Sequence, residues 1–175
     1  MNEAEIRAIV EKVIERMANV EPTGAAQVAV GGDHGGFPLK KYLAEQLTSA
    51  GFSVIDCGTY STDAVDYPDI AAKVAETVAQ GKASRGIIVD TAGIGSCMAA
   101  NKIKGIRAAL CYNEKTVLNS RVHNNANVLT LGAAYHEPGE ALQLAKLWLS
   151  TEFEGGRHQK RIDKISALEG CGCKS

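Results

Sequence analysis

Apolar residues along the chain form two kinds of pattern, and the two alternate. Five short runs are almost continuously apolar, as in strands buried on both faces: QVAVGG (27–32), FSVIDCG (52–58), RGIIVD (85–90), GIRAALCY (105–112) and VLTLGA (128–133). The segments between and after them predict helices, most of them from apolar residues at helical spacing, over 38–49, 68–80, 97–102, 115–122, 139–150 and 159–168. This alternation predicts an α/β fold, a Rossmann-like three-layer α/β/α arrangement around a five-stranded parallel sheet.

The first residues carry a helical pattern of their own. Residues 1–18 predict an amphipathic helix whose apolar stripe consists of Ile6, Ile9, Val10, Val13, Ile14 and Met17. Residues 19–27 contain Pro22 and Gly24 and read as a linker. We therefore expect a helical extension at 1–18, a linker at 19–27, the main domain at 28–168 and a tail at 169–175.

The composition narrows the possible functions. The chain has 175 residues, enough for one domain, and its formal net charge of −1 offers no basic excess for nucleic acid. It has no apolar run of the roughly 20 residues that a membrane span needs, and its charged beginning is unlike a secretory signal, so we expect a cytoplasmic protein.

Five cysteines, an odd number, argue against a disulfide framework. Cys171 and Cys173 alone would make a weak metal site, and a flexible tail is the favoured interpretation.

Two glycine-rich turns follow predicted strands, and ligands of such folds bind at the carboxyl ends of strands. The first, GGDHGGF (31–37), places Asp33 and His34 there, although Asp33 has the alternative role of capping the next helix. The second, TAGIGSCMAANK (91–102), matches neither the Walker nor the dinucleotide-binding pattern. Its successive N–H groups near a helix start suit an anionic intermediate.

Further candidates lie later in the chain. His123 and Asn124 come just before the last strand, where an imidazole can move protons or simply cap the strand. Arg157 and Arg161 lie four residues apart, so they share a helix face that suits a phosphate. The alternative for this pair is an ordinary solvated helix face.

Taken in order, six blocks of sequence resemble the ribose-5-phosphate isomerase B family, to which the galactose-6-phosphate isomerase subunits are related. The blocks are VAVGGDHGGF, VIDCGTYSTDAVDYPD, the glycine-rich loop that ends in AANK, GIRAAL, HNNANVLTLGA and TEFEGGRHQKRIDKI. The resemblance extends over about 28–165, which is nearly all of the main domain.

This resemblance implies an aldose–ketose isomerisation of a sugar phosphate through an enediolate, without a metal or organic cofactor. It also implies a homodimer, or a dimer of dimers, with sites between subunits. His34, Arg157 and Arg161 would hold the phosphate, and Asp33 and Tyr60 would contact the sugar. His123 would assist ring opening, with Asn124 beside it. The backbone of Gly93, Ile94 and Gly95 would stabilise the enediolate, and Thr91 and Ala92 of the same loop would also contact the substrate.

Several positions depart from the family pattern. Asp90 replaces the cysteine that the family commonly uses as its base, and Ser96 occupies the position of a glutamate base found in another branch. Ala92 replaces a threonine, and Ala134 an arginine, while Cys97 matches neither base position. A carboxylate can serve as an isomerase base, and burial at a strand end would strengthen it, so we hypothesise that Asp90 is catalytic. The alternatives are a different sugar, or a sugar-phosphate binding protein without isomerase activity.

The helical extension resembles, in pattern only, the encapsulation peptides that direct enzymes into bacterial microcompartments. That resemblance implies contact with a microcompartment shell or with other cargo. Packing within the protein's own oligomer is the equal alternative. A membrane role is disfavoured because the polar face mixes acidic and basic residues.

Overall fold

A computed structural model describes residues 7, 8, 11 and 27–169 of the chain. Three helical positions aside, the amphipathic helix predicted for 1–18 lies outside the described residues, as does the predicted linker up to residue 26. Cys171 and Cys173 also lie outside them. Within the described part, no helix is long and apolar enough to cross a membrane.

The predicted parallel sheet is confirmed. Its strands are β1 (Gln27–Gly32), β2 (Ser53–Asp56), β3 (Arg85–Asp90), β4 (Ala108–Leu110) and β5 (Val128–Gly132). They lie in the order β2-β1-β3-β5-β4, and every neighbouring pair is parallel. The three central strands β1, β3 and β5 are buried along nearly their whole length, as their continuous apolar sequences require.

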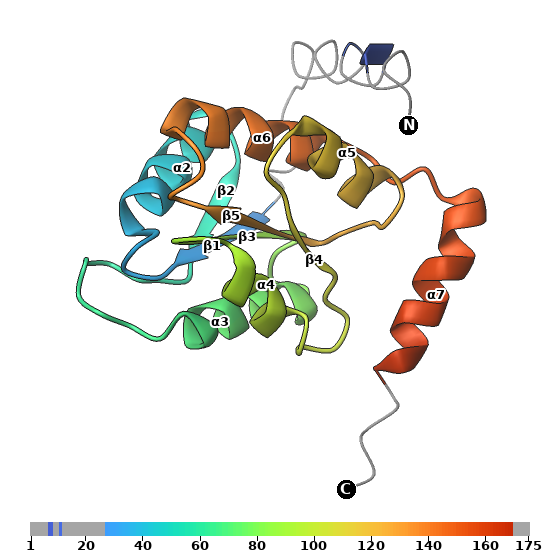
Figure 1. The fold of residues 1–175 in the computed structure, drawn as a ribbon, viewed down its shortest axis with the longest axis horizontal. Helices are drawn as coiled ribbons and strands as arrows, with labels where there is room; N and C mark the ends of the chain where they lie inside the picture. Colours follow the sequence, from blue (N-terminus) through green and yellow to red (C-terminus); the bar gives the residue numbers. More distant parts are fainter. Residues whose placement is uncertain (1–6, 9–10, 12–26, 170–175) are drawn as a thin grey trace, which may run out of the picture.

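Helices cover both faces of the sheet (Figure 1). They are α2 (Phe37–Ser49), α3 (Tyr67–Ala79), α4 (Ile94–Ala100), α5 (Glu114–Val122), α6 (Pro138–Ser150), the short 3₁₀ helix η1 (Gly156–His158) and α7 (Gln159–Leu168). One face carries α2, α5 and α6, and the opposite face carries α3 and α4. The molecule is therefore the three-layer α/β/α arrangement that the sequence predicts.

Each face has its own hydrophobic core. On the α2, α5 and α6 face, Leu43, Leu118 and Trp148 are fully buried against the sheet. On the other face, Val74 and Ala75 of α3 pack with Ile88 and Val128. Because both cores press on the same strands, the loops at the strand ends are held on a rigid frame.

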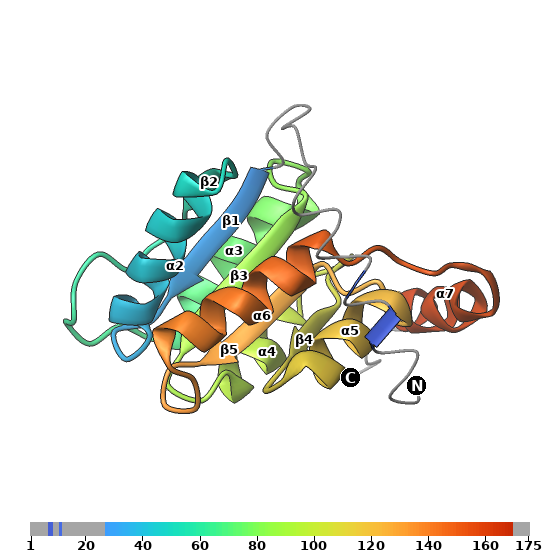
Figure 2. The same cartoon turned by 90° about the horizontal axis from the view of Figure 1, so that it is seen from above.

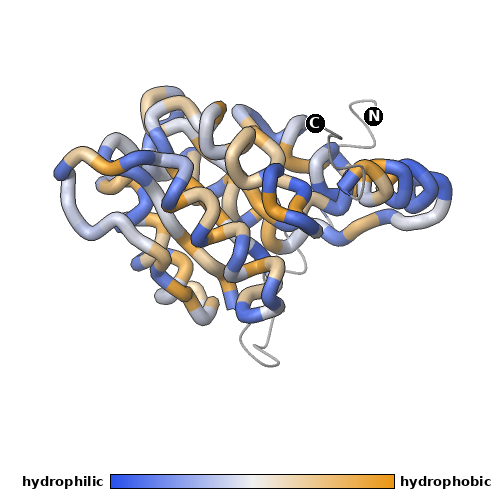
Figure 3. Tube along the Cα trace, turned by 90° about the horizontal axis from the view of Figure 1, so that it is seen from below, coloured by the Kyte–Doolittle hydropathy of each residue, from blue (hydrophilic) through white to orange (hydrophobic). Residues whose placement is uncertain are grey.

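Helix α7 lies apart from these layers and extends from one side of the molecule (Figures 1 and 2). It is mostly hydrophilic (Figure 3). Ile162 is its only buried residue in the described structure, while Ile165 and Leu168 are 44% and 69% exposed. The helix thus presents apolar side chains that are exposed in the described structure.

Two boundaries differ from the sequence prediction. Helix α4 begins at Ile94, three residues before the predicted start, because Gly93 takes a left-handed conformation (φ 77°) and ends the loop early. Strand β4 has only three residues, since it lies at the edge of the sheet and pairs with β5 alone. The nine other predicted strands and helices between 27 and 168 agree with the structure to within a few residues.

The sheet has a topological switch point at β1. Helix α2, which follows β1, packs on one face, and α4, which follows β3, packs on the other. The loops that leave β1 and β3 therefore run toward opposite faces, and the carboxyl edge at this point is the usual ligand position in such folds.

Candidate functional site

The two glycine-rich turns lie side by side at this carboxyl edge. The Asp33 N–H donates to the Val89 carbonyl over 3.2 Å, which ties the first turn to the end of β3. A Cβ added at Gly36 would overlap that same carbonyl oxygen, and one added at Gly35 would overlap the Thr91 hydroxyl. Glycine is thus required because two backbones approach each other closely.

Asp33 and His34 differ in exposure. Asp33 is buried, and its Oδ1 accepts the Gly36 N–H over 2.8 Å, so it closes the turn in front of α2. The sequence left open a cap for the next helix, but Asp33 closes the turn just before it, and the N-cap residue of α2 is Gly36, without a side-chain cap. His34 is exposed, and its Nδ1 accepts the Val65 N–H over 3.3 Å, which orients the ring.

Tyr60 lies on the loop after β2, and a buried lysine supports that loop. Lys40 is 1% exposed; its Nζ lies 2.6 Å from Asp56 Oδ1, donates to the Thr59 carbonyl and lies 5.0 Å from the centre of the Tyr60 ring. Tyr60 itself is 68% exposed and free to meet a ligand. Sequence reasoning missed Lys40, although its spacing to Leu43 and Leu47 (i+3 and i+7) places it on the buried stripe of its helix.

The Asp90 carboxylate, at the end of β3, accepts four hydrogen bonds. Oδ1 accepts the N–H groups of Ala92 (2.8 Å) and Gly93, and Oδ2 accepts the N–H (3.1 Å) and the hydroxyl (2.5 Å) of Ser96. Both Asp90 and Ser96 are buried. The carboxylate therefore organises the loop from 91 to 96 and the start of α4.

Because Asp90 accepts the N–H groups of Ala92, Gly93 and Ser96, other groups of the loop remain available to a ligand. Within the described structure, the N–H groups of Thr91, Ile94 and Gly95 donate to no protein group. Cys97 is not a ready thiolate, because burial raises its pKa and its Sγ donates to the Ala108 carbonyl. Of the loop residues, Asp90 is the one anionic group.

Aromatic side chains that the sequence analysis did not single out border the loop. The Tyr112 hydroxyl donates to the Ala92 carbonyl over 3.2 Å, and its ring meets the Tyr135 ring edge-on at 5.4 Å. Tyr135 is 61% exposed. It follows Ala134, where the family pattern has an arginine. The side chains beside the loop are therefore aromatic here instead of cationic.

His123 and Asn124 belong to a second group of residues. His123 caps the carboxyl end of α5, and Asn124 donates from Nδ2 to both the carbonyl and the Oδ1 of Asn119. The His123 ring stacks on His158, with centroids 4.3 Å apart and planes 14° apart. Burial, and then the neighbouring His158, lower the pKa of His123, against the opposing effect of Glu154.

Arg157, on η1, lies next to this stack, and Arg161 lies near the start of α7. Both are exposed, and Arg157 Nε donates to His158 Nε2 over 3.3 Å. The four-residue spacing thus brings the two guanidinium groups to the exposed side of a continuous helical segment.

One cluster has the composition of a metal site. Ligand atoms of His123, Glu154 and His158 all lie within 4.8 Å of one another. The imidazole lone pairs lie in two nearly parallel, stacked ring planes, so they do not converge on a common point, and Arg157 adds a positive charge beside them. A cation would bind only after one ring had turned, and we assign no metal to this cluster.

Asp33 and Asp90 lie at the carboxyl ends of the parallel strands, whereas His123 and Asn124 lie at the opposite, amino ends. Asn127, three residues after Asn124, accepts a hydrogen bond from Gly86 at the start of β3, whereas Asp90 ends that strand. Four residues of strand separate these points, about 13 Å. One copy of the chain therefore does not bring Asp90 and His123 together around one small ligand.

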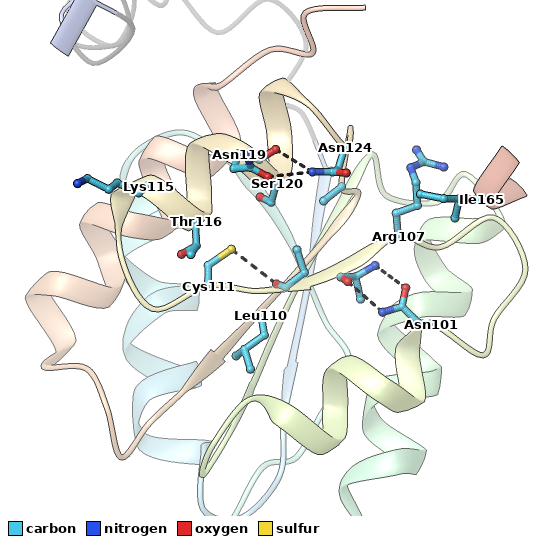
Figure 4. Close-up of a pocket in the computed structure, with 13 residues that line it drawn as sticks. Asn101, Arg107, Leu110, Cys111, Lys115, Thr116, Asn119, Ser120, Asn124 and Ile165 are labelled. Atoms are coloured by element: carbon cyan, nitrogen blue, oxygen red, sulfur yellow. Dashed lines mark hydrogen bonds between the residues drawn. The ribbon is translucent and has the colours of Figure 1, made fainter. Parts of the chain in front are cut away.

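A pocket of about 600 Å³ lies on the His123 side, between β4 and α5 (Figure 4). Asn119, Asn124 and Arg107 line it, together with Ile165 from α7. Its lining includes Ala108, Ala109 and Leu110 of β4, the edge strand of the sheet.

Proteins similar to this chain in sequence are sugar-phosphate isomerases or are described as putative ones. A family model described as Ribose/Galactose Isomerase matches residues 28–165. The chain is 44% identical to a putative sugar phosphate isomerase of Bacillus subtilis over 144 residues (82% of this chain, 97% of the relative). It is 42% identical to ribose-5-phosphate isomerase B of Escherichia coli over 147 residues (82% and 96%).

Two solved structures of ribose-5-phosphate isomerase B are similar to this chain over most of its length. Ribose-5-phosphate isomerase B of Clostridium thermocellum superimposes with a TM-score of 0.81 at 45% identity, over 82% of this chain and 97% of that one. The Mycoplasma genitalium enzyme, solved with bound ribulose 5-phosphate, gives a TM-score of 0.79 at 43% identity, over 82% and 95%.

Proposed function

Because the chain belongs to the ribose/galactose isomerase family, we propose that it interconverts an aldose phosphate and a ketose phosphate. Ribose 5-phosphate and ribulose 5-phosphate, or a close analogue, are the proposed pair. The observation that carries the proposal is the meeting of the two turns, Asp33–His34 and Asp90–Gly95, at the carboxyl edge of β1 and β3.

The proposed reaction moves one proton between adjacent carbons. A base takes the proton from C2 of the open-chain aldose, and the C–H electrons form the C1–C2 double bond while the carbonyl oxygen becomes an enediolate oxygen. The proton then returns to C1, the hydroxyl proton of the C2 oxygen passes to the C1 oxygen, and the C2 oxygen becomes the carbonyl. N–H groups of the loop, among them those of Ile94 and Gly95, are proposed to stabilise the enediolate.

We assign the proton transfer to Asp90, the anionic group of the loop. All four of its lone-pair positions are occupied, so one donor must leave before the carboxylate accepts a proton. The Ser96 hydroxyl is the donor that leaves by rotation of a single side-chain bond. Asp90 with a rotating Ser96 is therefore the proposed base.

The complete site is proposed to form between two copies of the chain. One copy supplies Asp33, His34, Tyr60 and Asp90, and the other supplies His123, Asn124, Arg157 and Arg161. The separation of these groups in one chain supports this assignment, as do the uncovered apolar residues of α7. The two arginines and His34 would hold the phosphate.

A second function, sugar-phosphate binding without turnover, is favoured by one observation. A carboxylate that accepts four hydrogen bonds already has a structural role in holding its loop. In that case Asp90 would anchor the loop, and the phosphate-binding residues would retain the ligand.

Turnover of ribose 5-phosphate by native protein, Asp90→Asn and Asp90→Cys separates the two functions. An isomerase with Asp90 as base loses turnover in Asp90→Asn and recovers part of it in Asp90→Cys, since a thiolate restores a base. Binding of ribose 5-phosphate by the native protein with no turnover of any sugar phosphate in a panel would establish the second function instead.

For residues 1–18, we propose a docking role, either in a microcompartment or in the protein's own oligomer in the cytoplasm. Removing residues 1–20 tests it. Loss of co-localisation with shell proteins at unchanged activity would support the first role, and a changed oligomeric state would support the second.

A further inference from the structure

A side chain outside the predicted site controls the orientation of His123. Asn119 lies one helical turn before His123 on α5, and its Nδ2 lies 3.0 Å from His123 Nδ1. It also lines the pocket beside β4 (Figure 4).

The direction of this hydrogen bond follows from a neighbouring backbone group. The Asn119 carbonyl only accepts, so the end of the Asn124 side chain that faces it at 3.1 Å is the amide nitrogen. That nitrogen also faces one end of the Asn119 side chain at 3.0 Å, and this end must then be the oxygen (Figure 4). The other end of Asn119, which faces His123, is therefore its NH₂ group.

An amide NH₂ group is a donor only, so His123 Nδ1 accepts. A ring nitrogen that accepts carries no proton, and the neutral ring then carries its proton on Nε2. We propose that Asn119 is a positioning residue that keeps His123 neutral with the proton on Nε2. Resting on the proposed function, this makes His123 a hydrogen-bond donor toward a substrate oxygen.

The other groups around the ring are compatible with this state. His158 stacks on it, Arg157 lies beyond His158, and Glu154 Oε2 lies 3.9 Å from His123 Nε2. The two positive or potentially positive neighbours oppose a second proton, and burial does the same. Glu154 acts in the opposite direction from the Nε2 side, where it favours a proton on that nitrogen.

This state has a chemical consequence for ring opening and for the enediolate. A neutral imidazole polarises an oxygen by donating from Nε2 without removing a proton from it, and neutral imidazoles act as electrophiles in other isomerases. His123 would thus stabilise developing negative charge on a sugar oxygen, while the base is supplied by the other copy.

Nitrogen-15 NMR of the four histidines in the full chain tests the proposal, with His123→Gln used to assign the signals. Native His123 is expected to show an unprotonated Nδ1 and a protonated Nε2 at pH values above about 6.5. Asn119→Asp replaces the donor by an acceptor of the same shape, so it should move the neutral proton to Nδ1. Asn119→Leu should leave a mixture of both tautomers.

Kinetics provide the second measurement. In Asn119→Asp, the acid limb of the pH profile should shift to higher pH, and kcat should fall about tenfold while KM changes by less than about twofold. Glu114→Gln, a change at an exposed position of the same helix, should alter neither the tautomer nor the profile.

Two results would overturn the proposal: a native His123 with its neutral proton on Nδ1, or an Asn119→Asp variant with unchanged tautomer and unchanged acid limb. The spectra are recorded without substrate. A native Nε2–H tautomer in a protein that isomerises no sugar phosphate would support the control by Asn119 and contradict the proposed function.

Discussion

The Ser96 hydroxyl donates to Asp90 Oδ2 over 2.5 Å, and the Ser96 N–H donates to the same oxygen. One residue thus holds the carboxylate oxygen that the proposed reaction needs, through its backbone and its side chain. We expect Ser96→Ala to destabilise the protein by about 1–3 kcal/mol, the usual cost of losing a hydrogen bond to a buried charged group. Because it frees a lone pair of Asp90, kcat should be at least half that of the native protein.

Thermal unfolding and ribose 5-phosphate turnover measure these two effects. Ser49→Ala is the matched control, since the Ser49 hydroxyl donates to the Glu45 carbonyl on an exposed helix face. A Ser96→Ala variant that loses turnover while it stays folded would count against Asp90 as the base.

Gly36 should tolerate no side chain. A Cβ there would overlap the Val89 carbonyl oxygen, which is part of the central sheet, so Gly36→Ala should displace the first turn and lower the unfolding free energy by more than about 2 kcal/mol. Gly139→Ala provides the contrast, because its Cβ meets no atom within 4 Å and the position lies in α6. It should be neutral or stabilising by up to about 1 kcal/mol. Denaturant titrations of both variants measure their unfolding free energies. Equal values for Gly36→Ala and Gly139→Ala would contradict the close contact between Gly36 and Val89.

Lys40 should matter for both stability and substrate binding. Lys40→Met keeps the aliphatic stem but removes the ion pair with Asp56 and the bond to the Thr59 carbonyl, at an expected cost of about 1–3 kcal/mol. The loop that carries Tyr60 would loosen, so KM for the sugar phosphate should rise more than kcat falls. Lys41→Met, at the exposed neighbouring position, should change unfolding by less than about 0.5 kcal/mol. Equal behaviour of the two variants would remove the assigned role of Lys40.

His123 makes stability depend on pH. Its pKa in the folded protein lies below the ordinary 6.5, so the unfolded chain binds the proton first as the pH falls. The contribution is fully favourable above about pH 6.5 and is lost progressively below it. Unfolding free energies measured from pH 7.5 down to about 5 should therefore fall less steeply in His123→Gln than in the native protein. Parallel curves would show that His123 titrates normally.

Much of the fold could be predicted from the sequence because its strands are short and almost continuously apolar. The separation of the site residues could also have been predicted. Asp33 and Asp90 lie at or just after the ends of strands, whereas His123 precedes a strand, and in a parallel sheet these positions lie at opposite ends of the strands. Lys40 was missed because its residue type suggested solvent exposure, although its helical position pointed inward.

Other features depend on geometry that residue patterns do not encode. The four donors to Asp90 converge because Gly93 turns the loop back toward β3, and the role of Asn119 depends on which end of two amides faces a carbonyl. The sequence analysis identified Asp90 and His123 as candidates, but the side chains that hold them became visible only in three dimensions.

The central claim is an isomerase whose sites combine two copies of this chain, and subunit complementation tests it most directly. Asp90→Asn and His123→Gln should each be inactive alone. Co-expressed with different tags, they should form mixed dimers in half of the molecules, and each mixed dimer has one site with both residues native. Ribose 5-phosphate turnover should then recover to about one quarter of the native value. Confirmed mixed dimers without recovered turnover would contradict the account.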